Sequence, residues 1–159
     1  MNRIGDSLFH TGANEEIIRT FSQNAVEFIV IGGLAVAWYC SEGQADDMDI
    51  LVNPTTDNSV RICKSLDSLH LNGHNVNSFA KLGVQVSLKE IHYADILTPR
   101  KSDPQYSEVA EDAVDAKLFN ISVRVASIAS LIRMKKLAVE SAEGLRDKHL
   151  NDIELLKIK

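Results

Sequence analysis

The fold of this chain is decided by EFIVIGGLAVAWYCSEGQADDMDILV, residues 27–52. The run EFIVI at residues 27–31 is short, β-branched and stops at a glycine pair, which indicates a buried strand. A short helix is expected over residues 34–40, and DMDILV predicts a second strand over residues 47–52.

Length and charge bound the class of protein. The chain has 159 residues, a formal net charge of -5, 45% hydrophobic and 25% charged residues. These values predict a single domain over residues 1–159 and exclude a disordered or collagen-like chain. No apolar run is long enough to span a membrane, and no targeting segment is evident, so we expect a cytoplasmic protein without a membrane partner. The acidic balance argues against a broad basic nucleic-acid surface.

The remaining pattern alternates strands with helices. We expect helices over residues 14–24, 56–70, 105–113, 127–141 and 149–159, and strands over residues 84–88, 91–98 and 121–125. The two strands at 84–98 are expected to meet around a turn at residues 89–90. Such a mixture predicts an α/β or α+β domain with one sheet.

Acids stand where strands are predicted. Asp47 and Asp49 alternate with Met48, so in a strand both would point to one face and could hold divalent cations. Alternatively the strand begins at Ile50 and the acids form a solvated turn. Asp95 is an isolated acid on the apolar face of its strand, either an edge residue that reaches water or a third metal ligand.

Two further features could bind phosphate. Gly32 and Gly33 lie between a strand and a helix, where they either form a tight turn or let the backbone approach an anion. Lys135 falls in the middle of the apolar stripe of the helix at residues 127–141, so it either snorkels to water or points its ammonium into a cleft. Arg146 and Lys148 are candidate phosphate contacts or surface charges.

The order of these features resembles the DNA polymerase beta-like nucleotidyltransferase superfamily. The resemblance rests on the strand, Gly32-Gly33, the short helix, and Asp47-Met48-Asp49 followed by Ile-Leu-Val. Asp95, in ADILT, resembles the third acid of that fold. The fold so implied is α+β, a central mixed sheet flanked by helices with a helical C-terminus.

The C-terminal part is similar to minimal bacterial nucleotidyltransferases related to the abortive-infection (AbiEii-type) toxins. It carries the segment SIASLIRMK at residues 127–135 and then RDKHLND at residues 146–152. The second segment matches the family pattern R-x-K-D-x-x-D at Arg146, Lys148 and Asp152, and departs from it at His149. Gly43 and Ala45 depart from the residues common before the D-x-D strand.

The resemblance implies transfer of a nucleoside monophosphate from an NTP, such as ATP, to an acceptor, with Mg²⁺ or Mn²⁺ as cofactor. Asp47, Asp49 and Asp95 would be the metal-binding and catalytic carboxylates, and Lys135 would offset phosphate charge. Nucleotide binding would fall to Gly32, Gly33, Lys135, Arg146 and Lys148. The implied acceptors are RNA, including tRNA, a protein, or a small molecule such as an aminoglycoside. A toxin role with an antitoxin partner and a homodimer are further expectations.

Two alternatives remain open at this point. His149 and Gly43 motivate a catalytically silent module that binds nucleotide or a partner protein. The same acids could also serve a metal-dependent hydrolase.

Overall fold

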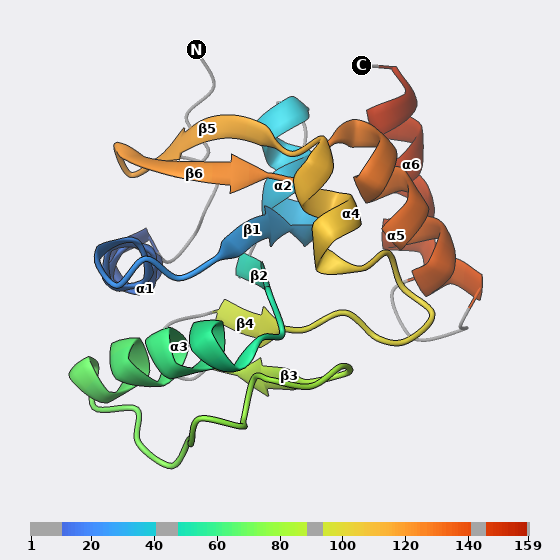
Figure 1. Ribbon diagram of the computed structural model, residues 1–159. Helices are drawn as coiled ribbons and strands as arrows, with labels where there is room; N and C mark the ends of the chain where they lie inside the picture. The colour runs from blue at the N-terminus through green and yellow to red at the C-terminus, as the bar shows by residue number, and fades with distance from the viewer. Residues whose placement is uncertain (1–10, 41–47, 89–93, 141–145, 159) are drawn as a thin grey trace.

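The computed structural model describes residues 11–40, 48–88, 94–140 and 146–158. Six strands form one mixed sheet, with helices on both of its faces (Figure 1). The elements are, in chain order, α1 (Thr11–Gln23), β1 (Phe28–Ile31), α2 (Gly32–Tyr39), β2 (Met48–Val52), α3 (Thr56–Ser68), β3 (Gln85–Ser87), β4 (Ala94–Leu97), α4 (Tyr106–Glu111), β5 (Val114–Leu118), β6 (Ile121–Val125), α5 (Ile128–Glu140) and α6 (Arg146–Lys157). The expected α+β architecture with a helical C-terminus is confirmed.

The order of strands across the sheet is β3-β4-β2-β1-β6-β5. β2 runs parallel to β4 and β1 runs parallel to β6, whereas the other neighbouring pairs are antiparallel. β2, with the sequence MDILV, therefore lies between β1 and β4 in the middle of the sheet. The predicted antiparallel pairing of the strands at residues 84–98 is confirmed, and the turn expected at residues 89–90 lies outside the described residues.

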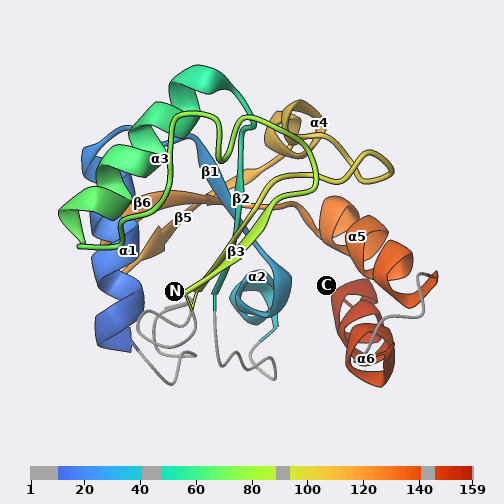
Figure 2. The same cartoon turned by 90° about the horizontal axis from the view of Figure 1, so that it is seen from below.

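Alternation along the strands gives the sheet two different faces. Phe28 of β1 meets Phe21 of α1 edge to face, with 5.9 Å between the ring centroids. Residues in register with this side, such as Ile50 and Ile96, are fully buried. Figure 2 shows α1 and α3 together on one side of the strands, and α5 and α6 on the other. The side chains of Asp49 and Asp95 alternate with the buried set, so they lie on the face turned toward α5.

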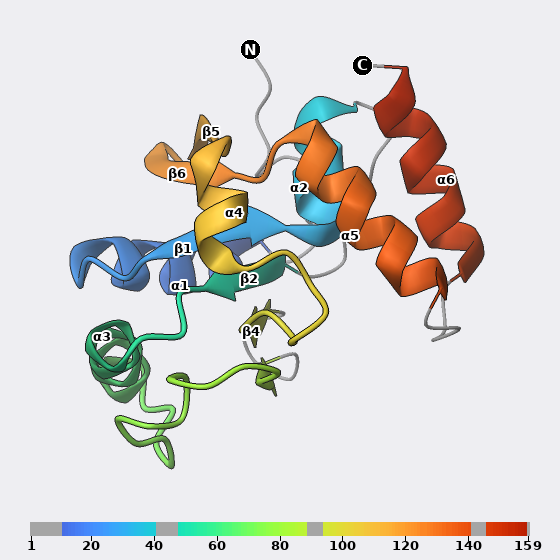
Figure 3. The same cartoon turned by 45° about the vertical axis from the view of Figure 1, so that its right-hand side comes forward.

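The C-terminal helices form a second layer beside that face. α5 packs against α6, and both also contact α2 (Figure 3). Leu131 of α5 and Leu156 of α6 are 1% exposed and belong to the main core. This packing fixes the position of α5 relative to the strands that carry the acids. None of the helices in the described part of the chain is long and apolar enough to cross a membrane.

Candidate active site

The acids of two neighbouring strands lie side by side. Asp49 of β2 is the direct register partner of Asp95 of β4, and because paired residues share a face, both carboxylates project from the same side. Asp95 is 5% exposed and Asp49 is half-buried. Asp47, the third predicted ligand, lies outside the described residues. The interpretation of Asp95 as an edge residue that reaches water is therefore wrong, because the side chain is buried in an inner strand.

The buried carboxylate of Asp95 is held by a side chain from the next strand. Gln85 Nε2 of β3 donates a hydrogen bond of 3.2 Å to Asp95 Oδ2. Such a bond limits the rotation of the carboxylate. The sequence offered no signal for this contact, because a glutamine near the start of a strand is common on solvated edges.

Gly32 meets the acid pair from the β1 side. Its backbone has φ = +70°, a conformation that side chains rarely adopt. A Cβ placed there would overlap Asp49 Oδ2 and lie 3.1 Å from Asp49 Cβ and Cγ. Gly32 and Gly33 also begin α2, where the N-cap residue Ile31 has no polar side chain to bond the first N–H groups. The two glycines therefore place the positive N-terminal end of α2 next to the carboxylate of Asp49.

Lys135 of α5 is buried on the apolar stripe of its helix. Its side chain is 7% exposed, so its ammonium does not snorkel to water. Nζ lies 3.0 Å from Asp152 Oδ2 of α6 and 3.3 Å from His149 Nδ1. Burial and the charge of Lys148 lower the pKa of Lys135, while Asp152 and Asp49 act in the opposite direction. The influence of Asp49 links this cluster to the acid pair.

The other basic candidates divide into two cases. Lys148 Nζ lies 3.4 Å from Asp152 Oδ2, and its side chain is 45% exposed, so it belongs to the Lys135 cluster. Arg146 begins α6, and its side chain lies outside the described residues. Asp152 is 7% exposed and forms ion pairs with both Lys135 and Lys148. Its match to the family pattern did not predict this structural role.

His149 supplies a pH-dependent contact in this cluster. Burial, Lys135 and Lys148 lower the pKa of His149, which leaves the ring neutral near pH 7 so that Nδ1 can accept a hydrogen bond from Lys135. The unfolded chain, with a His pKa near ~6.5, binds this proton more readily than the folded protein. We therefore expect the free energy of unfolding to fall as the pH drops below about 6.5 through the lower folded-state pKa.

Urea unfolding at several pH values between about 7.5 and 5 checks this expectation. His149→Gln keeps a polar group that cannot titrate, so its stability should depend less on pH in that interval. Equal slopes for the two proteins would contradict the assignment.

The same face of the sheet carries a pocket of about 370 Å³. Leu51 and Leu97, two residues beyond Asp49 and Asp95 on the same strands, lie in its wall, as do Ile31, Gln85 and Met134. The pocket thus continues the acid face toward α5. In the part of the chain that the structure describes, no three potential metal ligands come together.

Comparison with solved structures identifies the fold. A nucleotidyltransferase-like antigenic protein from Paracoccidioides brasiliensis is 14% identical, with a TM-score of 0.52 over 91% of this chain and 73% of its own. ANT(2")-Ia in complex with adenylyl-2"-tobramycin is 12% identical, with a TM-score of 0.58 over 89% and 84%. The solution structure of the same antibiotic-resistance factor gives 0.61 over 91% and 80%, also at 12% identity.

No protein-family profile matches the chain. No curated protein matches it in sequence. The AbiEii-type resemblance is thus not borne out at the level of sequence comparison, and at these identities the structural likeness concerns the fold. This chain has the fold of nucleotidyltransferases.

Proposed function

We propose that this chain is a Mg²⁺-dependent nucleotidyltransferase that moves a nucleoside monophosphate from an NTP to an acceptor hydroxyl. The observation that carries the proposal is the pairing of Asp49 and Asp95 on one face of the sheet. The helix N-terminus at Gly32 lies against Asp49, and the charge of Asp49 acts on the buried Lys135. Carboxylates beside two phosphate-attracting elements suit a substrate that is a metal-bound polyphosphate.

The chemistry of the acid pair fits a hard divalent cation. Mg²⁺ prefers carboxylate oxygens and is commonly held by one or two carboxylates together with substrate phosphates. Asp49 and Asp95 would supply such ligands, and the sequence adds Asp47 as a third. The bound ion would neutralise charge on the triphosphate and polarise its α-phosphate.

The other steps of the reaction fall to individual side chains and to backbone N–H groups. The N–H groups at the start of α2 and the Lys135 ammonium bind the triphosphate and offset its charge. Asp95, held by Gln85, orients the acceptor hydroxyl and takes its proton. The acceptor oxygen forms a bond to the α-phosphorus, the bond from that phosphorus to the bridging oxygen of the β-phosphate breaks, and pyrophosphate leaves with the electron pair.

The resemblance indicates three broad classes of acceptor. ANT(2")-Ia was solved with an adenylylated antibiotic, which makes small molecules a first class to test. RNA, including tRNA, and protein acceptors form the other two classes. A toxin role and an antitoxin partner stay predictions that a growth assay would check.

The decisive experiment incubates the protein with Mg²⁺ and each α-labelled NTP, offering total RNA, purified protein and small hydroxylated antibiotics as acceptors. We expect label in one acceptor class, loss of labelling with EDTA, and no labelling by Asp49→Ala. Label in no acceptor, or equal labelling by Asp49→Ala, would contradict the proposal. Nucleotide binding without turnover would favour a silent module, and release of free nucleotide would favour a hydrolase.

A further inference from the structure

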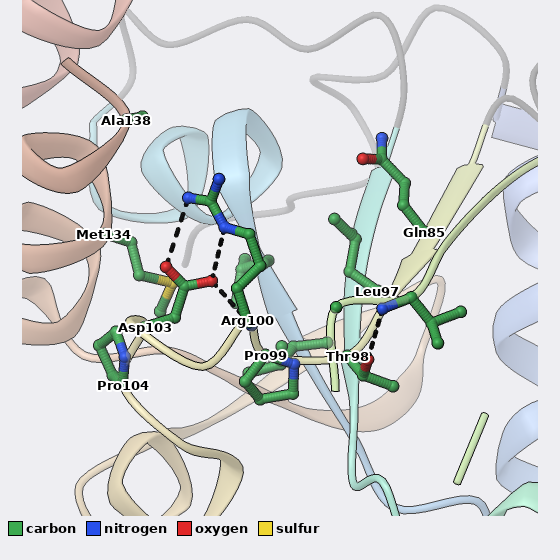
Figure 4. Close-up of a pocket in the computed structure, with 13 residues that line it drawn as sticks. Gln85, Leu97, Thr98, Pro99, Arg100, Asp103, Pro104, Met134 and Ala138 are labelled. Carbon is green, nitrogen blue, oxygen red and sulfur yellow. Dashed lines mark hydrogen bonds and ion pairs between the residues drawn. The ribbon is translucent and has the colours of Figure 1, made fainter. Parts of the chain in front are cut away.

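The pocket beside the acid pair is bounded by three parts of the chain. Figure 4 shows Met134 and Ala138 of α5 on one side, Gln85 and Leu97 of the sheet on the other, and Arg100 between them. The segment at residues 98–104, which follows β4, completes the wall. Its volume, about 370 Å³, lies within the range of small-molecule sites.

The lining is mostly apolar and offers little net charge. Isoleucine, leucine, valine, proline, methionine and alanine side chains make up most of it. Among the described residues that line it, the one carboxylate is that of Asp103, which is already paired with Arg100: Oδ2 lies 3.1 Å from Arg100 Nε and Oδ1 lies 3.3 Å from Arg100 Nη2. A polycationic acceptor would require unpaired acids, so this lining suits a flat, uncharged group instead.

Two residues that line the pocket are chain neighbours of the elements that would bind phosphate. Ile31 in its wall directly precedes Gly32, and Met134 in its wall directly precedes Lys135. Leu51 and Leu97 in its wall lie two residues from Asp49 and Asp95 on the same strands and share their face of the sheet. A molecule whose triphosphate lies at the acid pair would therefore extend its other end into this space. Gln85, which contacts the pocket and bonds Asp95, keeps an amide oxygen and a second N–H for the edge of a bound ring.

We propose that this pocket binds the nucleobase of the donor NTP, with Met134 and Ala138 packing on the base and Gln85 facing its polar edge. The inference rests on the proposed function, since it places the second half of the same substrate. Apolar side chains and the planar guanidinium of Arg100, which lies between the two walls, are surfaces on which bases stack.

The test compares binding of Mg–ATP with binding of Mg–tripolyphosphate, which lacks the base, by calorimetry. Ala138→Trp fills the pocket, and Ala129→Trp, on an exposed position of the same helix, is the matched control. We expect the wild-type protein and Ala129→Trp to favour ATP by about tenfold or more. Ala138→Trp should lose that preference while its affinity for tripolyphosphate is unchanged.

Met134→Ala guards against a tryptophan that prevents folding. It removes a wall rather than filling the space, and should weaken ATP binding by about three- to tenfold with tripolyphosphate unaffected. Thermal unfolding confirms that each variant is folded. An unchanged ATP preference in both variants would overturn the inference and leave the proposed function standing. An Ala138→Trp protein that binds ATP with the same preference but no longer labels its acceptor would have the same two consequences. Wild-type protein that binds neither ligand would overturn both.

Discussion

Asp49→Asn is expected to lower nucleotide transfer by about 10³-fold or more, because it removes one of two adjacent charges that would hold the metal. The substitution keeps the shape of the side chain in the middle strand of the sheet, so the fold should survive. In the absence of Mg²⁺ we expect a melting temperature equal to or higher than that of the wild type, since Asp49 and Asp95 are like charges side by side. Loss of activity with retained stability is the signature of a catalytic carboxylate.

The companion measurement is the shift of the melting temperature on adding Mg²⁺ and ATP. Ligand that binds only the folded state raises the melting temperature of the wild type, and Asp49→Asn should show a much smaller rise. Asp67→Asn, an exposed carboxylate on α3, is the matched control and should keep both the activity and the shift. If Asp49→Asn kept its activity, or if Asp67→Asn lost it equally, the acid pair would not be the site.

The central part of the fold could be predicted from sequence because two hydrophobic patterns, the apolar runs of the strands and the apolar stripe of a helix, were unusually clear. The strands around Ile29 and Ile50 are short apolar runs that end at glycines or at Asn53-Pro54, and the structure places both in the sheet interior. The helix at Lys135 was placed by its apolar stripe, and of the two alternatives for that lysine the structure excludes an ammonium that snorkels to water. Patterns of this kind report a buried face directly.

β5 was missed for an equally physical reason. Its sequence, VDAKL, exposes Val114, Asp115 and Lys117 and buries only Ala116 and Leu118, so the apolar signal is weak. The turn that joins β5 to β6 has Phe119 and Asn120 at φ = +55° and +64°. A hairpin turn of this geometry favours Asn-Gly, so the residues Phe119-Asn120 gave no sequence signal for a hairpin. Pairing with β6, a tertiary interaction, makes this segment a strand.

The candidate site could be predicted only where single residues stood out against their element. An acid on an apolar strand and a lysine on an apolar stripe are anomalies, and both Asp95 and Lys135 were found in this way. Gln85 and Asp152 act through partners on other elements, β4 and α5, and a partner choice of this kind depends on the packed fold. The functional assignments all stay predictions: metal binding by Asp47, Asp49 and Asp95, and nucleotide binding by Gly32, Gly33, Lys135, Arg146 and Lys148.

Gly32→Ala is expected to have the second large effect, and it tests how the turn after β1 shapes the site. The new methyl group would overlap Asp49 Oδ2 while the backbone stays at φ = +70°, so the variant combines strain with displacement of the carboxylate. We expect a loss of about 2–4 kcal/mol in the free energy of unfolding and a ~10²-fold loss of transfer activity, since catalysis is sensitive to shifts of about 1 Å.

Gly73→Ala separates the two contributions. Gly73 also has a left-handed backbone, with φ = +101°, but a Cβ added there meets no atom within 4 Å. It should cost about 1–3 kcal/mol of backbone strain and leave the activity intact. Urea unfolding and the labelling assay, run on both variants, measure the difference. Both variants place an alanine at a positive φ, so a loss of activity in Gly32→Ala alone reports the contact with Asp49. Equal losses of activity in both would mean that Gly32 serves the turn alone.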